Sequence, residues 1–298
     1  MQLEDLMFRP NLMSGQVVLI TGGGTGLGRQ MAEACLILGA RVAIAGRRLA
    51  VLEAAAAEMM QSHGGTVLPV PCDIRNEASI DTMLDTVWKE LGPLTSLVNN
   101  AAGNFISRTE DLSPRGFDAI ANIVFRGSFF TTLACGKRWI AGGHKASVLS
   151  ILTTWVWNGG PFVVPSAMSK AGLAAMTQSL AVEWGGKGIR FNAIAPGAFP
   201  TEGMTARLKP GQGQGAYTDM RRNPLQRVGH MAELANLAVY LLHPASEYVN
   251  GQIIAIDGAE FQATGGNFSD YRAWTDQQWS EARQLIRATD KKTRQENS

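Results

Sequence analysis

Short apolar segments alternate with longer amphipathic segments along most of this chain of 298 residues. The apolar segments are rich in β-branched residues throughout, which is typical of strands that are buried on both faces. They are residues 16–21, 41–45, 67–72, 96–99, 147–152, 189–195 and 252–257. The helix-like segments between them are residues 26–38, 48–62, 77–91, 113–141, 165–184 and 231–242. The alternation predicts an α/β fold, with one doubly wound parallel sheet of about seven strands and helices on both faces.

Two segments fall outside this alternation. Residues from about 199 to 228 are rich in Gly, Pro and Arg, and a tail runs from about 259 to 298. Segments of this length inside a compact domain usually carry a function or remain disordered. We interpret the first as a substrate lid and the second as a C-terminal extension with one helix near 275–287. Residues 1–298 are thus predicted to form a single domain.

Charge and cysteine usage exclude several kinds of partner. Lys and Arg total 27 against 25 Asp and Glu, so the net charge of +2 gives no electrostatic basis for binding nucleic acid. Cys35, Cys72 and Cys135 lie far apart, and neither they nor the four histidines show the spacing of metal ligands. No apolar run suggests a membrane span, and residues 1–15 lack a secretory signal. We therefore expect no nucleic-acid partner, no metal site, no membrane span and a cytoplasmic location.

A glycine-rich motif follows the first predicted strand directly and opens the first predicted helix. Glycines at such a junction let the backbone turn tightly and approach a pyrophosphate, which then lies at the positive helix N-terminus. The residues expected to bind a dinucleotide here are Thr21, Gly22, Gly24, Thr25, Gly26, Leu27 and Gly28. This context predicts a nucleotide-binding sheet of the Rossmann type.

Cofactor choice depends on the end of the second strand, where an acidic residue would bind the ribose 2′-hydroxyl of NAD. The chain has Arg47 and Arg48 there and no acid, which favours the 2′-phosphate of NADPH. Either arginine alone can equally be a solvated residue that opens the helix. Asp73, with Ile74 beside it, is placed to accept a hydrogen bond from the adenine amino group. The alternative role of Asp73 is to cap the turn before Asn76.

The chain resembles the short-chain dehydrogenases/reductases over nearly its whole length. The resemblance rests on five motifs in the family's order: 21–28, Asp73, 99–103, Lys170 and 196–197. It implies that Asn100, Ala101, Ala102 and Gly103 floor the cofactor pocket. It also implies that Lys170 holds the nicotinamide ribose hydroxyls, that Pro196 and Gly197 start the segment facing the nicotinamide, and that Thr201 helps to bind the phosphates.

The chain departs from this family at one catalytic position. A helix that should open with Tyr-x-x-x-Lys has Ser166 in place of the tyrosine that protonates reduced ketones. Residues 102–107 and 160–171 are similar to the 2,4-dienoyl-CoA reductases, the branch that has serine there, and the lid and tail are similar too. This resemblance implies that NADPH delivers hydride to a conjugated acyl-CoA thioester. The thioester oxygen then carries the negative charge and needs hydrogen-bond donors, while water protonates the carbon.

Asn104 matches the asparagine that donates to this oxyanion in the same branch. Its alternative is a loop asparagine bonded to its own backbone. Lys170 follows Ser166 by four residues, so both project from one helix face, and the ammonium would raise the positive potential near the oxyanion. Ser166 either orients the lysine and its surroundings or caps the start of the helix.

Trp155 occupies the position of a second donor, a tyrosine in the mitochondrial-type reductases. Its indole N–H can donate but cannot exchange a proton as a phenol does, and it can instead wall the acyl pocket. Thr153 occupies the usual catalytic-serine position; its alternative is a strand-end hydroxyl bonded to backbone. The residues expected to contact the substrate are Asn104, Phe105, Trp155, Phe162, Ser166 and Phe199.

The expected partners are an acyl-CoA substrate and further copies of the chain. Basic residues in or beside the lid suit the phosphates of CoA, although they can equally be ordinary surface charges. They are Arg207, Lys209, Arg221, Arg222 and Arg227. The family resemblance implies a homotetramer. Two other functions stay open: a carbonyl reductase with an unusual proton donor, and a catalytically inactive nucleotide-binding protein.

Overall fold

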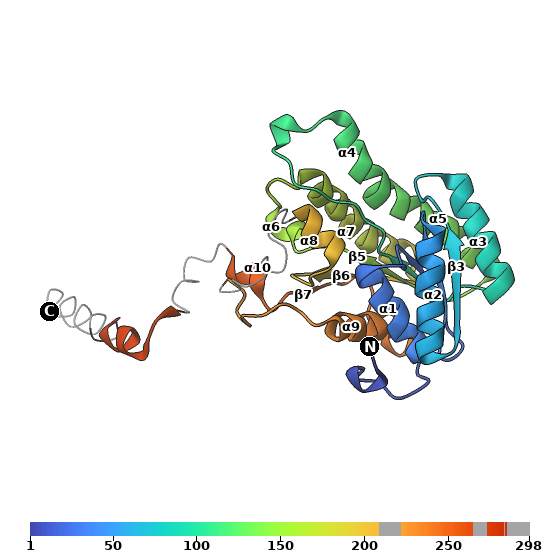
Figure 1. Cartoon of the computed structure of the whole chain (residues 1–298), viewed down its shortest axis with the longest axis horizontal. Helices are drawn as coiled ribbons and strands as arrows, with labels where there is room; N and C mark the ends of the chain where they lie inside the picture. Colours follow the sequence, from blue (N-terminus) through green and yellow to red (C-terminus); the bar gives the residue numbers. More distant parts are fainter. Residues whose placement is uncertain (209–221, 265–272, 283, 285–298) are drawn as a thin grey trace.

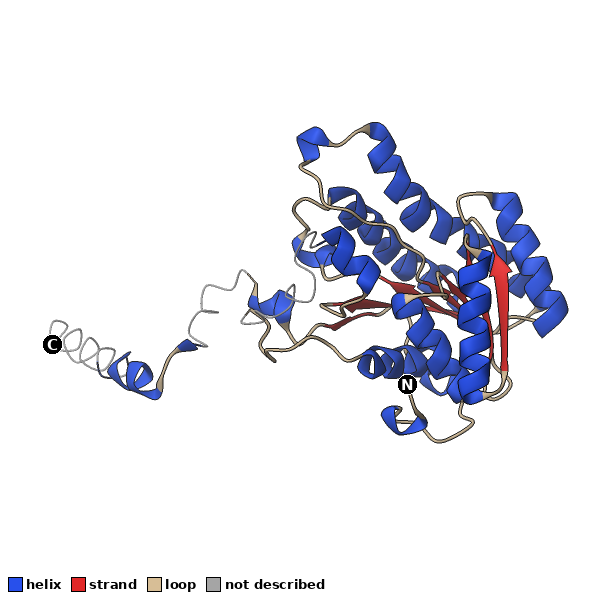
Figure 2. Ribbon diagram, in the orientation of Figure 1, coloured by secondary structure: helices blue, strands red, loops and turns tan. Residues whose placement is uncertain are grey.

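Seven parallel strands form one sheet in the order β3-β2-β1-β4-β5-β6-β7 (Figures 1 and 2). The computed structural model describes residues 1–208, 222–264, 273–282 and 284. The strands are β1 Val17–Thr21, β2 Arg41–Gly46, β3 Thr66–Pro71, β4 Ser96–Asn99, β5 Ala146–Ile151, β6 Ile189–Pro196 and β7 Ile253–Ile256. The strand order reverses between β1 and β4, so the carboxyl ends of these two strands border the crevice in which such sheets bind ligands. The predicted doubly wound α/β sheet is confirmed.

Helices cover both faces of the sheet, because alternate residues of each strand point to opposite sides. In β1, Val18 and Ile20 pack with one cluster of apolar side chains and Val17 and Leu19 pack with another. The first cluster includes α1 Gly26–Ile37, α2 Leu49–His63 and α9 Met231–Leu242. The second includes α3 Glu77–Leu91, α5 Ser128–Gly142 and α7 Val164–Gly185. The core therefore consists of two apolar layers with the sheet between them.

The long helix predicted over 113–141 consists of three parts. It starts as α4 Pro114–Ala121, where the Ser113 side chain caps the first turn, continues through the π-helical segment η3 Asn122–Gly127, and ends as α5. A Cβ atom on Gly127 would lie 2.7 Å from the Ile74 side chain, so glycine is needed where this segment packs on the loop after β3. The π-helical part thus lies against the end of the sheet that forms the nucleotide cleft.

The same helical stretch is long and apolar enough to cross a membrane by length and composition alone, which the sequence pattern did not lead us to expect. In the fold, α5 packs against α3 and α7, and α4 packs against α7. Core helices of globular proteins meet the same length and composition criteria. Packing within the fold buries 44% of the apolar window in Pro114–Gly142, so it accounts for part of the apolar character of this stretch.

Both segments outside the strand–helix alternation are described in part. The lid contains α8 Glu202–Leu208, and the chain then resumes at residue 222. The C-terminal extension begins with α10 Glu260–Ala263, and residues 276–282 are helical, within the predicted range of 275–287. Lys209 and Arg221 of the predicted basic cluster, and the chain end after 284, lie outside the described residues. A short helix that the sequence pattern did not predict, α6 Trp155–Asn158, follows β5.

Candidate active site

The glycine motif forms a tight turn between β1 and α1. Gly22 has a φ of +67°, in the left-handed region that favours glycine. A Cβ atom on Gly28 would lie 2.4 Å from both the Gly22 carbonyl oxygen and the Asn100 side-chain nitrogen, so no other residue fits there. The backbone amides that open α1 thus border the crevice at the sheet's switch point, which is where a pyrophosphate binds in such folds.

Thr21 and Asn100 hold the ends of β1 and β4 together. The backbone N–H groups of Asn100 and Ala101 both donate to Thr21 Oγ1, each at 3.1 Å. The Asn100 side-chain amide donates to the Thr21 carbonyl at 2.9 Å and to the Gly22 carbonyl at 3.2 Å. This amide therefore shapes the cofactor floor from within the protein. The family motif indicates the residue, but its bonding to the glycine turn is visible only in the structure.

A cleft of about 930 Å³ runs along this edge of the sheet. The cleft is lined by most of the residues predicted to bind cofactor and by two that were predicted to bind substrate. They are Thr21, Gly22, Gly24, Thr25, Arg47, Arg48, Asp73, Ile74, Ala101, Ala102, Gly103, Asn104 and Phe105. The lining thus combines basic residues, a glycine turn and the Asn104 amide. These residues fit a nicotinamide dinucleotide.

The adenosine end of the cleft carries two exposed cations. Arg47 and Arg48 line it, and neither guanidinium has a hydrogen bond or ion pair with any described residue. The Asp73 carboxylate, in contrast, accepts from the backbone N–H of Arg75 at 3.1 Å and from its Nε at 2.9 Å. Hydrogen bonding to Arg75 lowers the pKa of Asp73. Asp73 thus remains an ionised acceptor, and its carboxylate also holds the loop after β3.

Lys170 and Ser166 lie one turn apart on α7, and both are buried. The Lys170 ammonium is part of a side chain that is 6% exposed, and it donates to the carbonyl oxygen of Ile151 at the end of β5. Burial lowers the pKa of Lys170 to about 8. Ser166 is 4% exposed, its backbone N–H donates to the Val163 carbonyl, and its hydroxyl has no hydrogen bond to a described residue. The hydroxyl therefore does not cap the helix.

Asn104 is one of the residues that line the cleft. Its side-chain oxygen accepts from the backbone N–H of Phe105 at 2.9 Å. This bond fixes the orientation of the amide, and the side-chain nitrogen has no hydrogen-bond partner among the described residues. The bond to the local backbone that we considered as the alternative is therefore present, while the role of the N–H₂ group as an oxyanion donor stays a prediction.

Trp155 begins α6, directly after the loop that carries Thr153. A Cβ atom on Gly160 would lie 3.0 Å from the indole ring of Trp155, so this ring packs closely on the turn that leads to α7. The Thr153 carbonyl accepts from the Val156 backbone N–H, but its hydroxyl, like the indole N–H of Trp155, has no hydrogen bond to a described residue. The observed packing is consistent with Trp155 as a wall.

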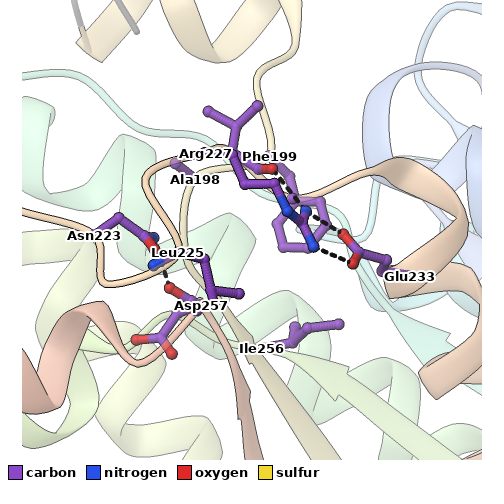
Figure 3. Close-up of a pocket in the computed structure, with 11 residues that line it drawn as sticks. Ala198, Phe199, Asn223, Leu225, Arg227, Glu233, Ile256 and Asp257 are labelled. Atoms are coloured by element: carbon purple, nitrogen blue, oxygen red, sulfur yellow. Dashed lines mark hydrogen bonds and ion pairs between the residues drawn. The ribbon is translucent and has the colours of Figure 1, made fainter. Parts of the chain in front are cut away.

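Phe199 lies in a second, smaller pocket of about 120 Å³ (Figure 3). The side chain is 2% exposed, and a Cβ atom on Gly229 would lie 2.3 Å from its ring. The Asn223 side chain donates to the Asp257 carbonyl at 2.8 Å in the same region. Phe199 and Asn223, near the two ends of the lid, are therefore both anchored beside the end of β7.

Two further predicted residues lie near these anchors. The backbone N–H of Gly197, just after Pro196, donates to the Ile256 carbonyl at 3.0 Å, so the start of the lid is hydrogen-bonded to β7. Thr201 approaches the glycine turn, since a Cβ atom on Gly26 would lie 3.5 Å from its methyl group.

Arg227 of the predicted basic cluster forms an ion pair with Glu233 at 2.7 Å, so its charge is neutralised. No cluster of metal ligands occurs among the described residues.

A parallel sheet with a dinucleotide cleft at its switch point, and a buried lysine at its edge, defines an oxidoreductase of the Rossmann type that uses a nicotinamide cofactor. The match to known proteins gives the family. A family model described as enoyl-(acyl carrier protein) reductase matches residues 22–258. The chain belongs to the short-chain dehydrogenase/reductase family, as its motifs predicted.

Related proteins cover most of the chain. An uncharacterised oxidoreductase of Caenorhabditis elegans is 44% identical, over 96% of this chain and 92% of its own length. A protein of the same organism named probable 2,4-dienoyl-CoA reductase 3 is 41% identical, over 94% of this chain and 92% of its own. The crystal structure of a short chain dehydrogenase from Bacillus anthracis is 41% identical with a TM-score of 0.75, covering 83% of this chain and 97% of that one.

Proposed function

We propose that the protein is an NADPH-dependent reductase of conjugated enoyl- and dienoyl-CoA thioesters, similar to the 2,4-dienoyl-CoA reductases of fatty-acid β-oxidation. The observation that carries the proposal is the Asn104 amide, which lines the cleft, has its oxygen bonded to the Phe105 N–H and has no hydrogen bond from its nitrogen to a described residue. Ser166 in place of a phenol agrees with it. The 41% identity to a protein named as a probable 2,4-dienoyl-CoA reductase also supports it.

Different residues of the site would bind different parts of the cofactor. The α1 amides and Thr201 would hold the phosphates, Arg47 and Arg48 the 2′-phosphate, and Lys170 the nicotinamide ribose. Bound NADPH would supply a hydride ion. The unpartnered guanidiniums at the adenosine end, together with the absence of an acid after β2, support NADPH over NADH.

Asn104 and Lys170 act on the charge that develops when the substrate is reduced. The distal carbon of the conjugated system accepts hydride, and the negative charge moves to the thioester oxygen. The Asn104 amide donates a hydrogen bond to this oxygen, and a preorganised donor of this kind lowers the barrier by about 3 kcal/mol. The buried Lys170 ammonium adds positive potential, and a water proton completes the reduction at carbon. No phenol is required, because no alkoxide is formed.

An assay with purified protein separates the three functions that the sequence leaves open. Protein, NADPH and a 2,4-dienoyl-CoA are mixed, and the loss of NADPH absorbance is followed. Oxidation that depends on the dienoyl thioester supports the proposal. Turnover of simple ketones without turnover of dienoyl thioesters selects the carbonyl reductase. NADPH binding without turnover of either class selects the inactive nucleotide-binding protein.

We further propose that the protein assembles as a homotetramer. Large apolar side chains are exposed on the helical segments within 113–141 and 164–185. They include Phe125, Phe129 and Val182. Val182 is 86% exposed, which is unusual for a branched apolar residue unless another subunit covers it. Light scattering at micromolar concentration should give the mass of four chains, and a monomer would contradict the proposal.

A further inference from the structure

The loop that carries Asn104 is held by a single backbone hydrogen bond. Among the described residues, the only backbone–backbone bond that links 102–107 to another part of the chain runs from the Ser107 N–H to the Phe162 carbonyl, at 2.8 Å. The other polar contacts of these residues are local, such as those of the Asn104 oxygen and of the Ser107 hydroxyl. The position of the Asn104 amide therefore depends on where the Phe162 carbonyl points.

Phe162 has an unusual backbone conformation. Its φ of +64° lies in the left-handed region, which aromatic residues rarely adopt because Cβ crowds the following carbonyl. Burial of the ring does not account for this, since the side chain is 58% exposed. The surrounding turn is packed: a Cβ atom on Gly160 would lie 2.8 Å from Val163 and 3.0 Å from Trp155. Strained backbone that is retained without a packing gain is characteristic of functional sites.

We propose that Phe162 is a positioning residue, whose left-handed backbone directs its carbonyl to Ser107 and so sets the location of the Asn104 amide. The same turn leads into α7 and to Ser166, four residues later, so one hydrogen bond joins the loop that carries Asn104 to the turn that precedes Ser166. The inference rests on the proposed function for the role of Asn104. The hydrogen bond between Ser107 and Phe162, which we call the clamp, does not depend on the proposed function.

Three substitutions separate the role of the backbone from that of the ring. Glycine adopts the left-handed conformation without steric conflict, alanine adopts it with some, and valine, being β-branched, resists it most. If the backbone matters, kcat should fall in the order Phe162→Gly, Phe162→Ala, Phe162→Val, with the valine variant at least about tenfold below the glycine variant. The KM for NADPH should stay the same in all three. If only the ring matters, valine retains most apolar volume and the order reverses, which overturns the proposal.

A second pair of variants tests the Ser107 side of the bond. Ser107→Pro removes the N–H donor, whereas Ser107→Ala removes only the hydroxyl. The proline variant should lose at least about tenfold more kcat than the alanine variant, again without a change in the KM for NADPH. Equal losses in the two variants would argue against the clamp.

Hydrogen exchange tests the clamp without any substrate. The Ser107 amide should exchange at least about tenfold faster in Phe162→Val than in Phe162→Gly, because its acceptor has moved. Equal exchange rates in the two variants overturn the inference. If the wild-type protein binds NADPH but reduces no dienoyl thioester, the proposed function fails, while this measurement still decides whether the clamp exists.

Discussion

The Lys170 ammonium donates a hydrogen bond to the carbonyl oxygen of Ile151, and no carboxylate forms an ion pair with it in the described part of the chain. The bond joins α7 to the end of β5. A buried cation with a single neutral acceptor is poorly compensated for the water that it has lost. Burial accordingly lowers the pKa of Lys170 to about 8. The fold thus keeps a buried charge that destabilises it, as expected if Lys170 has the role that we propose for it.

Replacing Lys170 by methionine should stabilise the protein at pH 7. The pKa of about 8 in the folded state lies below the unfolded value near 10.5, so the folded protein binds fewer protons between these two pH values. The penalty for burying the charge is therefore complete below pH 8 and disappears as the pH rises towards 10.5. It amounts to about 3 kcal/mol at most. Lys170→Met should raise the free energy of unfolding in urea at pH 7 by roughly 1 to 3 kcal/mol, since Ile151 loses its donor.

The matched control is Lys187→Met, because Lys187 is exposed on the turn after α7 and carries no such penalty. Its free energy of unfolding should stay within about 0.5 kcal/mol of the wild type. The gain from Lys170→Met should also shrink at pH 10. A gain that is identical at pH 7 and pH 10 would show that desolvation of the charge is not its cause.

The rate of reduction should fall as Lys170 loses its proton. Below pH 8 the ammonium carries the charge that favours the oxyanion, so kcat/KM should decline as the pH rises through about 8. Lys170→Arg keeps a positive charge at every accessible pH, so any activity that it retains should lack this decline. Steady-state rates between pH 6 and pH 10 provide the measurement. A flat wild-type profile over that range would remove the ammonium from the rate-limiting step.

Asn104 and Asn76 should show opposite effects when each is replaced by alanine. Asn104→Ala removes the proposed oxyanion donor and should lower kcat by about 10²-fold or more, with little change in stability. The Asn76 side chain caps α3 by accepting from the Ser79 N–H at 3.2 Å. Asn76→Ala should therefore cost about 1 kcal/mol of unfolding free energy and leave kcat unchanged. Steady-state kinetics and urea denaturation of both variants decide this, and near-normal turnover in Asn104→Ala would exclude its catalytic role.

The sheet could be predicted from sequence because each strand is a short, mainly apolar segment and these segments alternate with longer amphipathic ones. The short helix α6 Trp155–Asn158 could not, since a segment of four residues has no period and here is set by packing on the turn at Gly160. The π-helical segment at 122–127, which divides the long helix, is likewise set by a tertiary contact and could not be predicted. It occurs where Gly127 meets Ile74, which lies far away in the sequence.

The site was predicted from motifs, and the motifs identified residues rather than their partners. They indicated Asn104, but not that its oxygen is bound by the next N–H and its nitrogen is left for the cleft. Phe199 was among the residues expected to contact the substrate. The structure places it in a small separate pocket, because Gly229 leaves room for its ring. Contacts between distant segments of this kind carry no local sequence signal.

Arg47 and Arg48 should determine the preference for NADPH. Both are exposed and line the cleft, and neither guanidinium has a hydrogen bond or ion pair with a described residue, so both can bind a 2′-phosphate. Replacing both by alanine removes charge-assisted hydrogen bonds and should raise the KM for NADPH by about 10- to 100-fold. The KM for NADH should change by less than about threefold, since NADH lacks that phosphate.

The single variants show how the effect divides between the two arginines. Arg41→Ala is the control, because Arg41 is exposed at the opposite end of β2 and should leave both KM values unchanged. A double variant that keeps the wild-type KM for NADPH would show that the phosphate is bound elsewhere.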